Sequence, residues 1–159
     1  MQILVDADAL PGAIRELLFR AAIRREIPLL LVAGKPLRVP ASPYLHTLQV
    51  TAGPDEADDR IAALAQPGDL IITSDIPLAD RVVTRGAIAI SPRGERFHPD
   101  NIKHRLAMRD LLTQLRDTGE VTGGGPSAMT PKDVQAFANQ LDRTLAQLTR
   151  PKPGGQSEA

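Results

Sequence analysis

Short apolar runs recur along the first ninety residues at lengths typical of β-strands. In most of them apolar residues follow one another without alternation, which is the pattern of strands covered on both faces. The runs are residues 3–5 (ILV), 29–32 (LLLV), 45–50 (LHTLQV), 70–73 (LIIT) and 87–90 (AIAI). Strands covered on both faces are typical of parallel sheets, so this pattern predicts a mainly parallel central sheet of about five strands.

Amphipathic segments separate these runs. Apolar residues recur at helical spacing from residue 14 to residue 21, which predicts a helix that begins at Pro11 and ends before Pro28. Two more helices are expected at about residues 55–65 and 77–86, the second ending at a glycine. Alternating strands and helices predict an α/β sandwich of three layers, with helices on both faces of the sheet and right-handed crossovers.

The last third of the chain predicts two further helices instead of strands. Residues 99–117 and 131–149 each carry apolar residues at helical spacing, as amphipathic helices do. Thr130 and Asp133 stand three positions apart at the start of the second segment. This spacing is that of a capping pair, which predicts that the last helix begins directly after Thr130.

The length of the chain is that of one globular domain. With 159 residues, of which 42% are hydrophobic, it can bury one core and is short for two. The glycine-rich stretch 118–129 is expected to be a flexible loop, and residues 150–159 have almost nothing to bury. The expected organisation is therefore a domain over residues 1–149 followed by a disordered tail.

Charge and cysteine content exclude several classes of protein. Nineteen basic residues balance nineteen acidic ones and there is no cysteine, so the chain has no global positive field, no disulfide, no thiolate metal site and no cysteine nucleophile. We see no secretory signal pattern and no apolar run of membrane-spanning length. A cytoplasmic protein without membrane contact is expected.

Four aspartates are expected at one edge of the predicted sheet. Asp6 and Asp8 follow the first predicted strand and Asp75 follows the fourth. Parallel strands end at the same edge, where ligands bind in open α/β sheets. Asp58 lies at the border of the apolar face of the second predicted helix, whereas its neighbour Asp59 is expected to face water.

Carboxylates that converge from separate segments repel one another unless a cation binds between them. Oxygen ligands without cysteine or paired histidines favour a hard divalent ion, Mg²⁺ or Mn²⁺. Asp6 and Asp75 are the leading predicted metal ligands and catalytic residues. Asp8 and Asp58 are expected to complete the site directly or through water.

Helix capping is the alternative explanation for aspartates that follow strands. Asp8 and Asp75 would then cap the next helices and have no catalytic role. If Pro11 and Pro77 are the first helical residues, however, an apolar residue occupies each cap position. This spacing favours the functional cluster over capping, while Asp69, elsewhere in the chain, is expected to be solvated.

A phosphate-containing substrate also needs positive charge. Residues 93–109 (RGERFHPDNIKHRLAMR) are the most basic stretch, and Arg93 and Arg96 follow the last predicted strand, within reach of phosphates at the same edge. Ser74, a hydroxyl just after the fourth strand, is the third candidate substrate-binding residue. Arg105 is expected on a solvated helix face instead.

Several segments, in this order, resemble signatures of the YaiI/YqxD family of uncharacterised bacterial proteins, which is grouped with the PIN-like nuclease domains. They are VDADALP, GPDEAD, GDLIITSDIPLA, SPRGERF and MRD. The chain departs from the family where Leu10 replaces a usual cysteine and Val134 a usual arginine. The resemblance covers residues 1–149 and implies a PIN-like fold with an acidic metal site carried onto Asp6, Asp8, Asp58 and Asp75.

PIN-like chemistry implies a divalent-metal-dependent nuclease that hydrolyses phosphodiester bonds in RNA or another phosphodiester substrate. Two alternatives stay open. One is a non-catalytic RNA- or nucleotide-binding module that retains the metal site. The other is a haloacid-dehalogenase-like phosphatase with Asp6 as covalent nucleophile, although the paired acidic residues that such an enzyme needs further along are missing. The oligomeric state is left open by the sequence.

Overall fold

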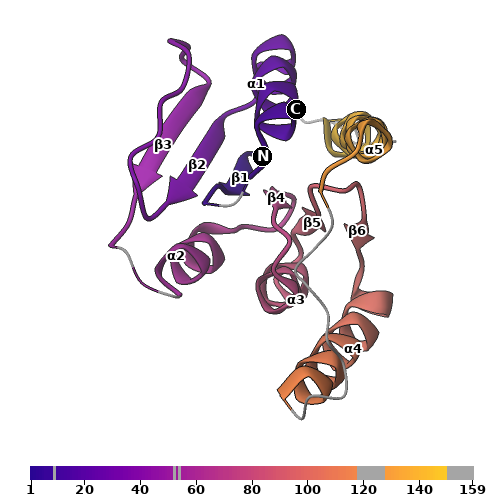
Figure 1. Ribbon diagram of the computed structural model, residues 1–159. Helices are drawn as coiled ribbons and strands as arrows, with labels where there is room; N and C mark the ends of the chain where they lie inside the picture. The colour runs from indigo at the N-terminus through magenta and orange to yellow at the C-terminus, as the bar shows by residue number, and fades with distance from the viewer. Residues whose placement is uncertain (9, 52, 54, 118–127, 150–159) are drawn as a thin grey trace.

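The computed structural model describes residues 1–8, 10–51, 53, 55–117 and 128–149, which contain six strands and five helices (Figure 1). The strands are β1 (Ile3–Asp6), β2 (Leu29–Ala33), β3 (Leu45–Gln49), β4 (Leu70–Ile72), β5 (Ile88–Ile90) and β6 (Arg96–Phe97). The helices are α1 (Gly12–Arg25), α2 (Glu56–Leu64), α3 (Ile76–Thr84), α4 (Pro99–Asp117) and α5 (Pro131–Thr149). All five predicted strands and all five predicted helices are confirmed, with small shifts at their ends.

The six strands form one sheet in the order β3-β2-β1-β4-β5-β6. Neighbouring strands from β3 to β5 are parallel, which confirms the predicted parallel sheet. β6 runs antiparallel to β5 and pairs Phe97 with Ala89 and Arg96 with Ile90. The sequence does not predict β6, because two residues are too few to give an apolar run.

Helices cover both faces of the sheet, so the fold is the predicted three-layer α/β sandwich (Figure 1). Successive strand residues point to opposite faces. In β1, Ile3 and Val5 join the core beneath α1 and α5, whereas Leu4 joins the core beneath α2 and α3. Ile102 extends this second core to α4, which packs beside α3.

The starts of three helices test the predicted caps. Thr130 and Asp133 form the predicted pair: the Thr130 N–H donates to Asp133 Oδ2 (3.1 Å) and the Asp133 N–H donates to Thr130 Oγ1 (3.2 Å). Pro11, by contrast, is the cap of α1 and Pro77 is the second residue of α3. Neither is the first helical residue as predicted, because several positions of a first turn tolerate the missing proline N–H.

The turn between β5 and β6 packs directly on α5. Gly94 has φ +91°, and a Cβ atom placed on it would lie 2.7 Å from the carbonyl carbon and oxygen of Ala136. Both the left-handed backbone and this close approach require glycine. The turn that carries Arg93 is therefore held at a fixed position against the last helix.

Asp69 corrects another expectation, since it is buried rather than solvated. Its carboxylate accepts hydrogen bonds from the backbone N–H of Gln66 (2.9 Å) and from the backbone and side chain of Gln2 (both 3.2 Å). A buried carboxylate is tolerated where donors surround it. One of these partners lies 67 residues away, which local sequence cannot reveal.

Two predictions fall outside the described residues. These are most of the glycine-rich loop, at 118–127, and the tail at 150–159. The flexible loop, the disordered tail and the domain boundary at residue 149 therefore stay predictions. None of the described helices combines the length and apolar character needed to cross a membrane.

Candidate functional site

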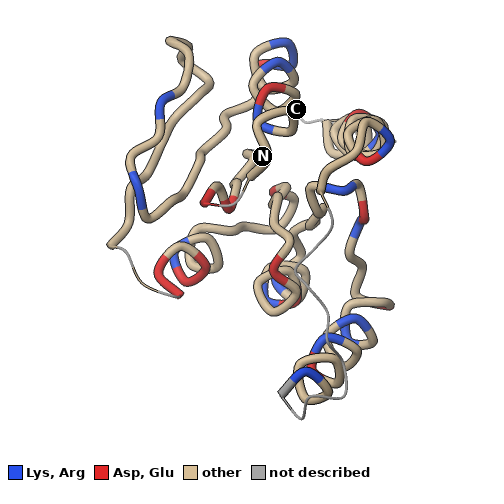
Figure 2. The backbone as a smooth tube through the Cα atoms, in the orientation of Figure 1, with Lys and Arg blue, Asp and Glu red and all other residues tan. Residues whose placement is uncertain are grey.

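The strand order reverses beside β1, because β2 and β3 lie on one side of it and β4 to β6 on the other. Such a reversal leaves a crevice at the carboxyl ends of the two central strands, which is the usual ligand site of open α/β sheets. Asp6 is the last residue of β1, and Asp75 follows β4. Asp58 comes from α2, which packs against β1, and Figure 2 shows acidic segments on these elements.

Asp6 lies half-buried at the end of β1. Its Oδ2 accepts a hydrogen bond from the Thr73 hydroxyl at 3.0 Å. Burial raises the pKa of Asp6, and the charges of Asp75 and Asp8 raise it further, whereas the Thr73 hydrogen bond lowers it. The net effect is a raised pKa, so this carboxylate lies where negative charge is disfavoured.

Among these side chains, Asp58 has the most strongly raised pKa. Partial burial, the charges of Asp75 and Asp6, a hydrogen bond with the Asp75 carboxyl and the charge of Asp55 together raise its pKa to about 7. Asp58 and Asp75 therefore lie close together, and the negative charge of Asp75 disfavours ionisation of Asp58.

Asp75 is also the N-cap of α3, where its Oδ1 accepts the Leu78 N–H at 2.9 Å. The capping interpretation is thus correct for this residue, and the spacing argument against it is wrong. Capping and membership of the cluster coexist, because the same carboxyl also interacts with Asp58. We refer to Asp6, Asp58 and Asp75 as the carboxylate cluster.

Thr73 joins two members of the carboxylate cluster, a role that the sequence analysis missed. This buried residue donates its hydroxyl to Asp6 and accepts the Asp75 N–H at 3.0 Å. Both bonds together orient the Asp6 carboxylate and the start of α3. A hydroxyl directly after the apolar residues 70–72 and two residues before Asp75 is the signal that would have found it.

Asp8 lies next to the cluster but faces a different partner. It is exposed, and its two carboxylate oxygens accept the Gly34 N–H at 3.0 and 3.1 Å. This contact ties the segment after β1 to the end of β2. The charge of Asp8 still raises the pKa of Asp6, so Asp8 as a ligand through water stays a prediction.

Positive side chains pair with other carboxylates. Arg81 pairs with the exposed Asp59 at 2.8 Å, which confirms that Asp59 faces away from the site, and Lys103 pairs with Asp80 at 2.7 Å. Within the described ranges, none of the ion pairs includes a residue of the carboxylate cluster. Among the described residues, the cluster therefore concentrates negative charge without an ion-paired cation.

The donor chemistry of the cluster fits a hard divalent ion that keeps its water ligands. Among the described residues, no three histidine, cysteine, aspartate or glutamate side chains are spaced to ligate one ion together. Mg²⁺ commonly binds one or two carboxylates directly and retains several waters. Asp58 and Asp75, which lie close together, would match that mode of binding, with Asp6 in contact with bound water.

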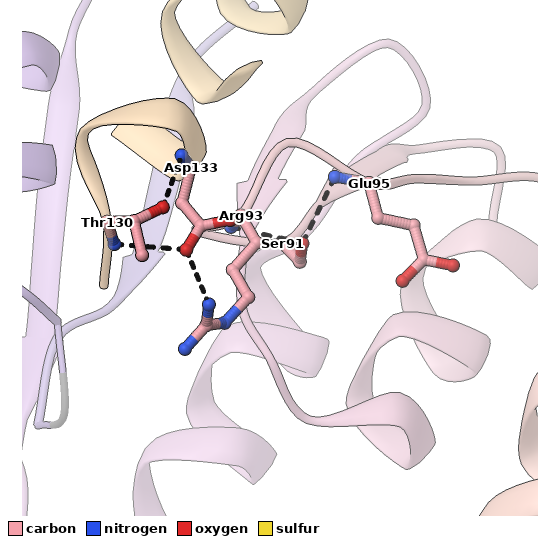
Figure 3. Close-up of polar contacts among 5 residues, drawn as sticks. All are labelled: Ser91, Arg93, Glu95, Thr130 and Asp133. Carbon is pink, nitrogen blue, oxygen red and sulfur yellow. Dashed lines mark hydrogen bonds and ion pairs between the residues drawn. The ribbon is translucent and has the colours of Figure 1, made fainter. Parts of the chain in front are cut away.

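The three predicted substrate-binding residues lie near the ends of neighbouring strands. Ser74 follows β4, Arg93 follows β5, and Arg96 is the first residue of β6. Arg93 pairs with Asp133 at 2.7 Å, and Arg96 donates to Gln147 Oε1 at 2.6 Å (Figure 3 shows the Arg93 contact). Ser74 and Arg93 both line a pocket of about 270 Å³, whereas Arg96 is not part of its lining. As substrate-binding residues, all three stay predictions.

The family model described as "Uncharacterized BCR, YaiI/YqxD family" matches residues 4–147. The chain belongs to the YaiI/YqxD family. It is 57% identical over 145 residues to a UPF0178 protein of Alkalilimnicola ehrlichii, covering 91% of this chain and 97% of that relative. A UPF0178 protein of Shewanella amazonensis is 51% identical over 150 residues, covering 94% of this chain and all of the relative. No solved structure matches the chain.

Membership of the YaiI/YqxD family covers every segment of the carboxylate cluster, because the match runs from β1 to α5. The printed names of these relatives mention no substrate or reaction. Any activity assigned to this member of the family must therefore rest on its residues and their geometry.

Proposed function

We propose that this protein is a divalent-metal-dependent nuclease that hydrolyses phosphodiester bonds, with RNA as the substrate class, at the carboxylate cluster. The observation that carries the proposal is the convergence of Asp6, Asp58 and Asp75 at the carboxyl edge of the sheet, where burial and the charges of Asp75 and Asp6 raise the pKa of Asp58 to about 7. Strongly perturbed carboxylates in a crevice are typical of functional sites. The proposed kinship with PIN-like nucleases, which the sequence motifs imply, supports the same chemistry.

A metal ion relieves a repulsion that the folded protein otherwise retains. Like-charged carboxylates raise one another's pKa until one of them holds a proton. Asp58 and Asp75 would hold a Mg²⁺ or Mn²⁺ ion, and Asp6 would contact its water ligands. When bound, the ion would supply neutralisation of phosphate charge and a water of lowered pKa.

The residues of the cluster differ in how firmly they are held. The Thr73 hydroxyl fixes Asp6, and the Leu78 N–H fixes one oxygen of Asp75. Asp58 is instead poised to gain or lose a proton near neutral pH, because its pKa is about 7. A carboxyl group must lose its proton before it binds a metal ion, so we assign metal binding to Asp58 and Asp75 and the positioning of bound water to Asp6.

Substitution by asparagine tests this proposal without removing the structural bonds. Asp6→Asn retains an oxygen for the Thr73 hydroxyl, and Asp75→Asn retains a good N-cap. We expect each variant to lose Mn²⁺-dependent cleavage of a labelled single-stranded RNA by about 100-fold or more. Asp59→Asn is the matched control, because it removes the same charge one residue from Asp58 but outside the cluster, and it should cleave normally.

A thermal-shift measurement provides a readout that does not depend on turnover. Mn²⁺ should raise the melting temperature of the wild-type protein, and the Asp6→Asn and Asp75→Asn variants should lose this shift. Because the ion competes with the proton on Asp58, the shift should be larger at about pH 8 than at about pH 6.

Three outcomes would contradict the nuclease proposal. Retained cleavage in both purified variants would reject the assigned residues. Binding of metal and RNA without product over a long incubation would favour the non-catalytic module. Release of phosphate from a monoester, with a phosphorylated Asp6 trapped, would favour the phosphatase instead.

A further inference from the structure

A pocket of about 270 Å³ adjoins the carboxylate cluster at the carboxyl edge of the sheet. Ser74 and Ile76, which flank Asp75, form one side of it. The opposite side comes from the turn after β5, including Ser91 and Arg93. Both sequence neighbours of Asp75, a residue of the carboxylate cluster, therefore line the pocket.

Apolar and polar residues both line the pocket. Phe97 of β6, which is 2% exposed, contributes apolar surface together with Ile76 and Met129. Ser91 is occupied in holding the turn, because its hydroxyl accepts the N–H groups of Arg93 and Glu95 at 3.3 and 3.1 Å (Figure 3). An apolar site with a few placed polar groups is the usual form of a small-molecule pocket.

Guanidinium groups give the lining of the pocket N–H donors that suit a phosphate. Arg93 and Arg105 both line it, and each is paired with a carboxylate, Asp133 and Glu95 respectively. Arg105 comes from α4 and donates its Nη2 to Glu95 at 2.7 Å. A guanidinium has five N–H donors in a planar fork, and the Glu95 bond uses the Nη2 end. Figure 2 shows further basic residues along α4.

We infer that this pocket holds one nucleotide next to the phosphodiester group that the carboxylate cluster acts on. The base or sugar would contact Phe97 and Ile76, and a phosphate would contact Arg105 and Arg93. The inference deepens the proposed function and rests on it, because it makes the pocket a subsite of the cluster. It also assigns a role to Arg105, which the sequence analysis placed on a solvated face.

The size of the pocket restricts the substrate to unpaired nucleic acid. A volume of about 270 Å³ lies just below the range of typical ligand pockets, roughly 300–1,000 Å³, so the pocket accommodates one small group. A base in a duplex is stacked and paired, and it enters such a pocket only after it is flipped out of the helix. Single strands and chain ends present their bases without that cost.

Adenosine monophosphate is a probe that tests the pocket without metal. In EDTA, we expect calorimetric titration of the full chain to give millimolar or tighter binding. Arg105→Ala should weaken it about tenfold through loss of a charged contact. Ser74→Tyr, which fills the pocket from its exposed side, should abolish binding. Arg109→Ala is the matched control, since it removes an exposed arginine one turn further along α4 that pairs with Asp110, and it should bind normally.

Cleavage of matched RNAs then separates this inference from the proposed function. With Mn²⁺, a single strand should be cut at least about tenfold faster than its duplex. Terminal products would show that a chain end occupies the pocket, and internal products that an internal nucleotide does. Equal cleavage of the two forms, or binding of the monophosphate that neither Arg105→Ala nor Ser74→Tyr weakens, would overturn the inference while leaving the nuclease intact. Binding that both variants weaken, in a protein that cleaves neither RNA, would instead overturn the nuclease.

Discussion

Asp58 and Asp133 occupy the same position in their helices, yet their surroundings are opposite. Each is the third residue of a helix, α2 or α5, and each follows a cap residue, Asp55 or Thr130. Asp133 accepts the Thr130 N–H and pairs with Arg93 (Figure 3). Asp58 instead faces Asp75 and Asp6, and Asp55 makes no side-chain capping bond.

The two carboxyl groups therefore titrate in opposite directions. The backbone hydrogen bond from Thr130 is the main cause that lowers the pKa of Asp133, with Arg93 contributing. Burial and neighbouring carboxylates raise the pKa of Asp58 to about 7. Asp133 has its partners within the protein, whereas Asp58 has like charges as neighbours. Asp133 therefore has a structural role, and the contrast supports the proposal that Asp58 binds a ligand from outside.

The largest expected effect on stability comes from the turn between β5 and β6, which packs on α5, the helix of Asp133. Gly94→Ala should lower the free energy of unfolding by about 3 kcal/mol, because alanine is strained at φ +91° and its Cβ would lie 2.7 Å from the Ala136 backbone. Urea unfolding followed by circular dichroism measures the change. Gly12→Ala is the control, since a Cβ there meets nothing within 4 Å. A loss at Gly94 no greater than at Gly12 would show that the turn does not depend on its contact with α5.

The second largest expected effect on stability concerns Asp58 in the carboxylate cluster. In the absence of metal, Asp58→Asn should stabilise the protein at about pH 8 by about 1–2 kcal/mol. This gain is smaller than the full pKa shift implies, because solvent screens a partly exposed charge. A raised carboxyl pKa means that the folded state binds more protons than the unfolded state between its ordinary value of 3.8 and about 7. The stability of the wild-type protein therefore falls as pH rises through this window.

The pH dependence of unfolding distinguishes this effect from a general change of charge. The gain from Asp58→Asn should be absent below about pH 4, grow towards pH 7 and then level off. Asp59→Asn should show no such growth, because Asp59 is exposed and pairs with Arg81. Equal pH profiles for the two variants would mean that the cluster does not perturb Asp58.

The smallest effect concerns the cap of α5. Thr130→Ala removes the hydroxyl that accepts the Asp133 N–H and should cost about 1 kcal/mol of unfolding free energy. Thr130→Ser keeps that hydroxyl and should be close to wild type. Because the pKa of Asp133 is lowered, the stability that it contributes is present above pH 3.8 and lost as pH falls through the lowered value. A Thr130→Ala variant as stable as Thr130→Ser would remove the cap from the explanation.

Much of the fold follows from short-range pattern. Apolar runs identify β1 to β5, and helical spacing identifies all five helices, because burial of one face imposes a period on the sequence. The capping pair of Thr130 and Asp133 was also predictable, since its partners lie three residues apart. The parallel arrangement then places Asp6 and Asp75 at one edge of the sheet.

What failed depends on partners that lie far away in the sequence. Asp69 was expected in solvent but accepts hydrogen bonds from Gln2. Arg105 is exposed, as expected, but its place in the lining of a pocket with residues from the ends of β4 and β5 was not predicted. Thr73 links Asp6 to Asp75, a connection that no local pattern carries.

The sequence by itself determined which segments are strands and helices and which carboxylates stand where those segments end, because these properties depend on neighbours within a few residues. Only the tertiary structure decided what each carboxylate faces. Asp58 and Asp133 have the same residue type and the same helical position, and the difference between them comes from Asp75 and Asp6 on one side and Arg93 on the other. Charge acts through space, so the chemistry of each site is set by the segments that the fold places beside it.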